Sequence, residues 1–98
     1  MRGLISGLNK HFESRIRLGI MSALMVNESL DFTSLKELLE VTDGNLASHL
    51  KALEKNEYIS VDKKFVGRKP NTTYQTTAMG KQHFTLHLNA LEKLIRGH

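Results

Sequence analysis

The spacing of hydrophobic positions predicts four helices and three short strands. Apolar side chains recur at every third or fourth residue over most of the chain, as at Ile16, Ile20 and Leu24, which is the pattern of one helix face. Elsewhere apolar and polar residues alternate, as around Ile59 and Val61, which is typical of a strand. Helices are expected over residues 13–26, 33–40, 44–56 and 78–95, and strands over residues 30–32, 58–63 and 72–77. This order predicts an α+β fold, mainly α.

The second and third predicted helices form a helix-turn-helix pattern, because both are short and are joined by about four residues. Thr33 is the expected N-cap of the first of them, and Thr42 or Asp43 that of the second. Leu46 begins a leucine stripe that continues at positions 50 and 53, so this face of the second helix is expected to be buried.

The opposite face of that helix lacks carboxylates. On a helix, Asn45, Ser48, Lys51, Ala52 and Lys55 fall on this side, with position 49 at its edge. Small polar residues permit close approach to base edges in a major groove, and lysines can neutralise phosphates. The alternative is a surface helix that is basic without any binding role.

The net charge of +4 is concentrated in one stretch of the chain. Between Gly44 and Lys81 there are seven Lys and Arg against three Asp and Glu, whereas the charges of the remaining residues cancel. This concentration indicates a polyanionic partner. The hairpin predicted around the turn at residues 65–71 contributes to it, since Arg68 and Lys69 lie at its tip and two further lysines lie at its expected base. Turns are often charged in any case, so this signal alone is weak.

Composition narrows the possible classes of protein. The length of 98 residues suggests one domain, expected to span residues 1–98. The absence of cysteine excludes disulfides and thiolate metal sites. No apolar run approaches the ~18 residues of a membrane span, and the first residues are too polar for a signal peptide, so a cytoplasmic location is expected.

The last helix predicts a homodimer. Its apolar residues at positions 84, 88, 91 and 95 follow a coiled-coil spacing, and further leucines widen the surface beyond what one small domain can cover. The N-terminal lead-in is expected over residues 1–12, and residues 4–12 of one chain are expected to pack near residues 84–95 of either chain. Residues 78–96 are expected to form the dimerisation helix. The predicted interface consists of Leu4, Leu8, Phe12, Phe84, Leu88, Leu91, Leu94 and Ile95.

Three segments resemble one known family. Residues 45–54, Asn-Leu-Ala-Ser-His-Leu-Lys-Ala-Leu-Glu, are similar to its recognition-helix signature. Residues 57–61 resemble the strand that follows, and residues 65–80 resemble the wing and the Thr-x-x-Gly start of the last helix. Over residues 13–95 the chain thus resembles a winged-helix transcription regulator of the ArsR/MarR type, in its small stand-alone form.

The resemblance implies a winged helix-turn-helix with a three-helix core, a β-hairpin wing and a long C-terminal helix. It also implies a homodimer on a pseudo-palindromic double-stranded operator, with residues 44–56 in the major groove and residues 63–72 on backbone or minor groove. The cysteine ligands of metal-responsive members are absent. We therefore expect base contacts from Asn45, Ser48 and His49, phosphate contacts from Thr33, Ser34, Lys51 and Lys55, and wing contacts from Lys64, Arg68 and Lys69.

A zinc site, an enzyme active site and a protein-binding function are the alternatives to this interpretation. His83 and His87 have a spacing that can hold zinc, with His11 or His98 as further ligands, but ordinary histidines beside an apolar seam explain them more simply. No nucleophilic cysteine, glycine-rich phosphate loop or converging carboxylate pair is present, so no enzymatic activity, metal or cofactor is expected. The alternative function is a winged-helix module that binds another protein and whose basic face is incidental.

Overall fold

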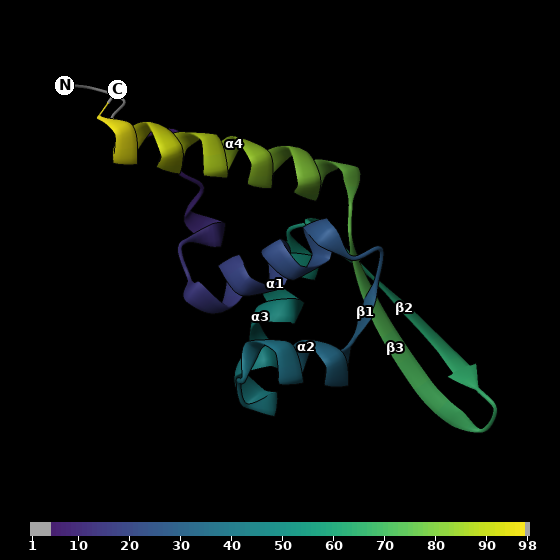
Figure 1. Ribbon diagram of the computed structural model, residues 1–98. Helices are drawn as coiled ribbons and strands as arrows, with labels where there is room; N and C mark the ends of the chain where they lie inside the picture. Colours follow the sequence, from purple (N-terminus) through teal and green to yellow (C-terminus); the bar gives the residue numbers. More distant parts are fainter. Residues whose placement is uncertain (1–4, 98) are drawn as a thin grey trace.

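The computed structural model describes residues 5–97, and Figure 1 shows how the elements are arranged. The elements are η1 (Lys10–Phe12, a single turn of 3-10 helix), α1 (Arg15–Val26), β1 (Leu30–Asp31), α2 (Phe32–Leu39), α3 (Asp43–Lys55), β2 (Ile59–Val66), β3 (Lys69–Thr76) and α4 (Ala78–Arg96). Helices α1, α2 and α3 pack together, α4 lies across one side of them, and the β2–β3 hairpin projects away from the helices. The predicted fold, mainly helical α+β with a hairpin and a long last helix, is confirmed.

Each α-helix begins at a polar residue whose side-chain oxygen accepts a backbone hydrogen bond. Ser14 serves α1, Thr42 serves α3 and Thr77 serves α4. These caps satisfy one of the N–H groups that a helix leaves without an internal partner. The expectation of Thr33 as the cap of α2 is wrong, because α2 begins earlier and Asp31 caps it.

The sheet has three antiparallel strands in the order β1-β3-β2. Strand β1 adds only two pairs, with Leu30 opposite Tyr74, whereas β2 and β3 pair along their whole length from Ile59 to Val66. The turn expected over residues 65–71 is therefore wrong in extent, since only Gly67 and Arg68 lie between the strands. Gly67 has φ 67°, and glycine at the first position of a two-residue loop matches the twist of the flanking strands. The lysines at 63 and 64 consequently lie in the distal half of the hairpin, not at its base.

The core lies between α1, α2 and α3 and continues under the start of the sheet. The expected stripe on α3 is confirmed, because Leu46, Leu50 and Leu53 are all at most 2% exposed. They pack with Leu35 of α2 and with the buried residues of α1. Burial of an α3 face against two other helices fixes which residues of α3 remain on the outside.

The N-terminal segment of the described chain packs on α4 of the same chain. Phe12 is completely buried, with its ring centroid 5.2 Å from that of Phe84 and 4.9 Å from that of Tyr58. The backbone N–H of Asn9 donates to Nδ1 of His87 at 2.9 Å, which ties the segment to the helix. The expectation that Phe12 and Phe84 lie in the dimer interface is wrong. Phe12 is 0% exposed and Phe84 is 1% exposed, because both rings fill the core of one chain. In residues 5–97, no helix is long and apolar enough to cross a membrane.

Candidate nucleic-acid interface

The outer face of α3 is uncovered by any other element of the described chain. Asn45, Ser48, Lys51 and Lys55 are exposed, and Ala52 is half-buried. Because the leucine stripe on the other side is held in the core, these side chains point outward together. Their small size near the N-terminal end of the helix leaves room for a duplex, and the two lysines follow on the later turns.

One carboxylate on α3 flanks this face. Glu54 is exposed, so the surface of the helix is not wholly free of acidic groups. Burial, and then the charge of Glu54, raise the pKa of Tyr74 in β3. Asp43, in the first turn of α3, forms an ion pair with Lys36 of α2 at 2.7 Å. The acidic groups of α3 are therefore Asp43, paired in its first turn, and Glu54, exposed in its last turn.

His49 is half-buried at the edge of the same face. Its Nδ1 accepts a hydrogen bond from Nε of Arg17 in α1 at 2.9 Å. Burial, and then the positive charge of Arg17, lower the pKa of the His49 imidazole. Arg17 is not among the site residues expected from the sequence, and no local signal could have found it, since it is separated from His49 by 32 positions.

At the start of α2, one of the backbone N–H groups is hydrogen-bonded to a carboxylate of the same chain. Thr33 is exposed and Ser34 is half-buried, but the backbone N–H of Ser34 donates to the Asp31 carboxylate at 2.7 Å. The hydrogen bonds from Ser34 hold the pKa of Asp31 below its usual value, so this carboxylate is ionised at neutral pH. The Asp31 carboxylate takes up the N–H of Ser34 and adds a negative charge at this helix end, and the phosphate contacts expected of Thr33 and Ser34 stay a prediction.

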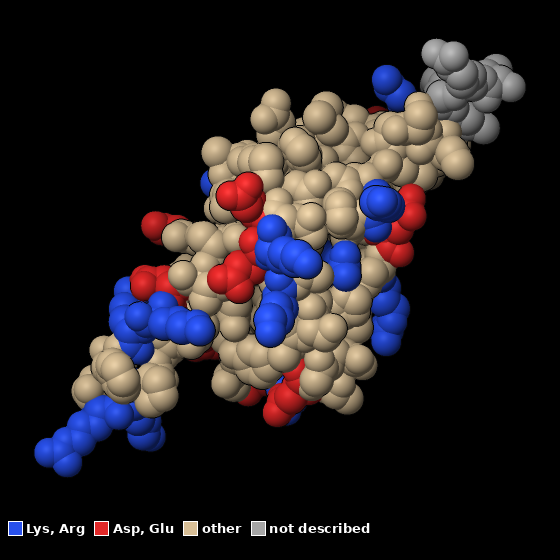
Figure 2. Space-filling view, turned by 180° about the vertical axis from the view of Figure 1, so that it is seen from behind, with Lys and Arg blue, Asp and Glu red and all other residues tan. Residues whose placement is uncertain are grey.

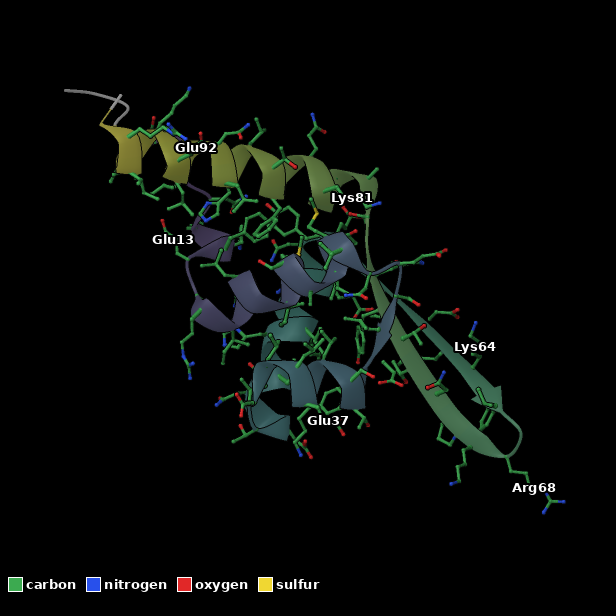
Figure 3. All side chains as sticks on the ribbon, in the orientation of Figure 1. Glu13, Glu37, Lys64, Arg68, Lys81 and Glu92 are labelled. Carbon is green, nitrogen blue, oxygen red and sulfur yellow. The ribbon has the colours of Figure 1, made fainter. Side chains whose placement is uncertain are left out.

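The hairpin carries the second concentration of positive charge. Residues 63–70 contain four Lys and Arg and no carboxylate. Lys64, Arg68 and Lys69 are exposed, and Figure 2 shows basic side chains gathered at the protruding end of the hairpin. Arg68 extends away from the tip in Figure 3. The Nζ of Lys64 lies 3.2 Å from the Asp62 carboxylate, but both side chains are more than half exposed, so this pair is weak.

Two apolar side chains at the hairpin tip were missed from the sequence. Phe65 is 72% exposed and Val66 is 63% exposed, and they pair across the strands with Pro70 and Lys69. The signal that could have found them is their position next to a two-residue turn, too far from the helices to reach a core. They add exposed apolar surface beside the basic tip.

The apolar residues of α4 divide between core and surface. Leu88 is 41% exposed and Ile95 is 84% exposed, whereas Leu91 and Leu94 are half-buried. Leu8 is half-buried beside this helix. Leu4 lies outside the described residues. Of the expected interface, Leu88 and Ile95 are therefore the side chains with the most free surface.

The histidines of α4 have hydrogen-bond partners within the chain. His87, 2% exposed, accepts from Asn9, and Nδ1 of His83 lies 3.4 Å from the hydroxyl of Tyr58. Over residues 5–97, no group of three or more His, Asp and Glu is placed to hold a metal ion. These two rings connect the N-terminal segment, α4 and the end of α3.

The comparison with known protein families supports the same interpretation of the fold. A family model described as "Winged helix DNA-binding domain" matches residues 16–95. The chain belongs to this family. The match covers the three core helices, the hairpin and nearly all of α4, and the resemblance to winged-helix regulators is confirmed.

Individual proteins are similar to this winged-helix domain over most of its length. Protein MJ0432 of Methanocaldococcus jannaschii is 36% identical over 75 residues, which cover 76% of this chain and 82% of that protein. A transcriptional regulator homologue of Pyrococcus horikoshii is 30% identical with a TM-score of 0.89, covering 99% of this chain and 97% of the other. An Enterococcus faecalis protein assigned to the MarR family of transcriptional regulators shares the fold, with a TM-score of 0.68 at 21% identity over 95% of this chain and 76% of that one.

Proposed function

We propose that this protein binds double-stranded DNA sequence-specifically as a homodimeric transcriptional regulator, and that it is not an enzyme. In this proposal α3 enters the major groove, and the hairpin lies on the backbone or in the minor groove. The observation that carries the proposal is the uncovered outer face of α3, on which Asn45 and Ser48 precede Lys51 and Lys55. Membership of the winged-helix DNA-binding family supports it.

The two sets of side chains have different chemical tasks. Asn45 and Ser48 can donate to and accept from base edges, which distinguishes sequences. The lysines of α3 and the cations of the hairpin bear full charges suited to phosphates, which are the same at every base step. Specificity is therefore assigned to the first turns of α3, and salt-dependent affinity to its later turns and to the hairpin.

Substitutions should separate these tasks. Lys55→Ala or Lys69→Ala is expected to weaken binding to all duplexes alike and to reduce the salt slope by ~1 for each phosphate that is no longer neutralised. Asn45→Ala is expected to change sequence preference, at ~1–3 kcal/mol for removal of a hydrogen-bonding partner of one base. The measurement is a titration of selected and random duplexes at several salt concentrations.

Lys93→Ala is the matched control, because Lys93 is an exposed cation on α4, away from both basic elements. It should leave the salt slope unchanged. Equal decreases in affinity for specific and random DNA in the Asn45 and Lys55 variants would contradict the division of tasks. No binding to any duplex at low salt would instead favour a protein-interaction module.

The homodimer is proposed from the apolar surface that one chain leaves free on α4. Leu88 and Ile95 lie on the same side of the helix, seven residues apart, and both are exposed. A second copy covering this surface would bury it from water, which is favourable for leucine and isoleucine.

A charge placed on this surface should dissociate the dimer. Leu88→Glu combined with Ile95→Glu is expected to reduce the mass in solution from that of two chains to that of one, because an unpaired carboxylate would be buried at the contact. Asn89→Glu is the control, since Asn89 is exposed on the same helix. Sedimentation of the three proteins at one concentration measures the result, and a single-chain mass for the unchanged protein would refute the dimer.

A further inference from the structure

Arg17 of α1 holds the imidazole of His49 on α3 in a defined position. Its Nε donates to Nδ1 of His49 at 2.9 Å, and its Nη1 donates to the backbone carbonyl of His11 at 3.4 Å. The guanidinium is thereby anchored to the turn before α1 as well as to α3. Because both ends of the contact are anchored, the ring of His49 is restricted in rotation.

The hydrogen bond determines which ring nitrogen carries the proton. A guanidinium has only donors and remains charged in proteins, so Nδ1 of His49 has to be the acceptor and carries no proton. The neutral imidazole then has its single N–H at Nε2. Burial, and then the charge of Arg17, lower the pKa of His49, which favours this neutral form at neutral pH. Arg17 is the one charged side chain that the described residues bring against the ring.

The remaining ring nitrogen reaches solvent. No group within residues 5–97 accepts from Nε2 of His49. Within the same part of the chain, every buried side-chain nitrogen or oxygen has a hydrogen-bond partner. Nε2 therefore has accessible surface. His49 also lies one helical turn after Asn45, at the edge of the outer face of α3.

We propose that Arg17 is a positioning residue that fixes His49 as a hydrogen-bond donor, through Nε2–H, for an acceptor on duplex DNA. The proposal rests on the proposed function and names the chemistry of one contact within it. Suitable acceptors in the major groove are N7 and O6 of guanine, N7 of adenine and O4 of thymine, and a phosphate oxygen has the same chemistry. The amino groups of cytosine and adenine are donors, so His49 in this state does not recognise them.

The tautomer can be measured on the free protein without DNA. In a ¹⁵N-labelled sample, the ring signals of His49 should show a protonated Nε2 and an unprotonated Nδ1, assigned by their loss in a His49→Gln variant. Arg17→Met should alter these signals, whereas Arg15→Met should not. Arg15 is exposed on the same helix and carries the same charge, so it is the matched control. Identical signals in both variants, or a protonated Nδ1 in the unchanged protein, would overturn the proposal.

The pH profile provides a second readout that a merely structural role would not change. Without the charge of Arg17, the pKa of His49 should rise. When the pH is lowered from about 8 to about 5, the ring should therefore become cationic at a higher pH than in the unchanged protein. The Arg17→Met variant should then gain affinity for all duplexes as the pH falls, with a salt slope steeper by about one. Arg15→Met should follow the profile of the unchanged protein, and the same profile in Arg17→Met would count against the proposal.

Two substitutions of His49 test the direction of the hydrogen bond to DNA. Glutamine can place its amide nitrogen near the position of Nε2, whereas asparagine reaches only the position of Nδ1. On the duplex selected from random DNA, His49→Gln should bind within about threefold of the unchanged protein and His49→Asn about tenfold more weakly. Equal affinities for these two variants would overturn the assignment of Nε2 as the DNA contact.

The DNA acceptor of His49 can be identified by comparing how much His49→Asn weakens binding to duplexes of different sequence. A base-edge acceptor predicts a changed preference at one base position, and a phosphate acceptor predicts an equal decrease in affinity on every duplex. If the unchanged protein bound no duplex, the proposed function would fail and the DNA acceptor with it. The ring-nitrogen signals would still decide whether Arg17 fixes the tautomer.

Discussion

Replacement of Phe12 by alanine is expected to lower the free energy of unfolding by about 4 kcal/mol. Phe12 is 0% exposed, and its ring contacts those of Tyr58, Phe84 and His87, with centroid distances of 4.9, 5.2 and 5.5 Å. Truncation would remove the transfer free energy of the ring and leave a cavity between η1 and α4. Because the surrounding rings belong to separate parts of the fold, they can close this cavity only in part.

The matched control is Phe65→Ala at the hairpin tip. The same atoms are removed there, but Phe65 is 72% exposed, so stability should change by only about 0.5 kcal/mol. Denaturant unfolding of both variants at one protein concentration measures the difference. A decrease in stability for Phe12→Ala as small as that for Phe65→Ala would mean that the N-terminal segment does not belong to the core of the chain in solution.

Replacement of Gly80 by alanine is expected to cost about 3 kcal/mol of stability. A Cβ at this position would overlap the carbonyl oxygen of Tyr58 and lie 2.8 Å from its carbonyl carbon. That carbonyl is held in place, because it accepts from the N–H of Thr77 at 3.1 Å and from the hydroxyl of Thr77 at 3.2 Å. The backbone where α4 approaches the segment between α3 and β2 would have to move. The Thr77 cap of α4 would be disturbed with it.

Gly44→Ala is the control for this substitution. Gly44 lies in the first turn of α3, and a Cβ there would meet no atom within 4 Å. Alanine is the better helix former by ~1 kcal/mol, so this variant should be slightly more stable than the unchanged protein. Thermal unfolding of both variants checks the prediction. A gain in stability for Gly80→Ala would show that the close approach of α4 to Tyr58 is not required.

Local patterns were sufficient for the elements of the fold and for the basic face of α3. The leucines at 46, 50 and 53 identified the buried side of the helix, because a 3.6-residue period places them on one stripe and leaves the polar residues opposite. Thr42 was one of two caps expected for α3, and it is the residue that caps the helix. These features depend on neighbours along the chain, which a sequence displays directly.

The predictions that were wrong concern the N-cap of α2 and the location of Phe12 and Phe84. In each case two residues or two environments fit the same local pattern. Asp31 and Thr33 are both good N-caps, and the choice of Asp31 depends on β1 pairing with β3, which fixes the extended backbone before α2. Phe12 and Phe84 have the same apolar character whether they face a core or a partner chain. Their burial depends on the N-terminal segment folding back onto α4, far away in the sequence.

The order of helices and strands, the leucine stripe of α3 and the basic character of its polar side all follow from residue patterns along the chain. Periodicity and capping act over a few residues, so these features could be inferred without coordinates. The packing of separate elements was needed to show that Asp31 caps α2, that Phe12 belongs to the core and that Arg17 contacts the ring of His49. Each of these depends on how separate elements pack or pair in space, which no local pattern of residues encodes.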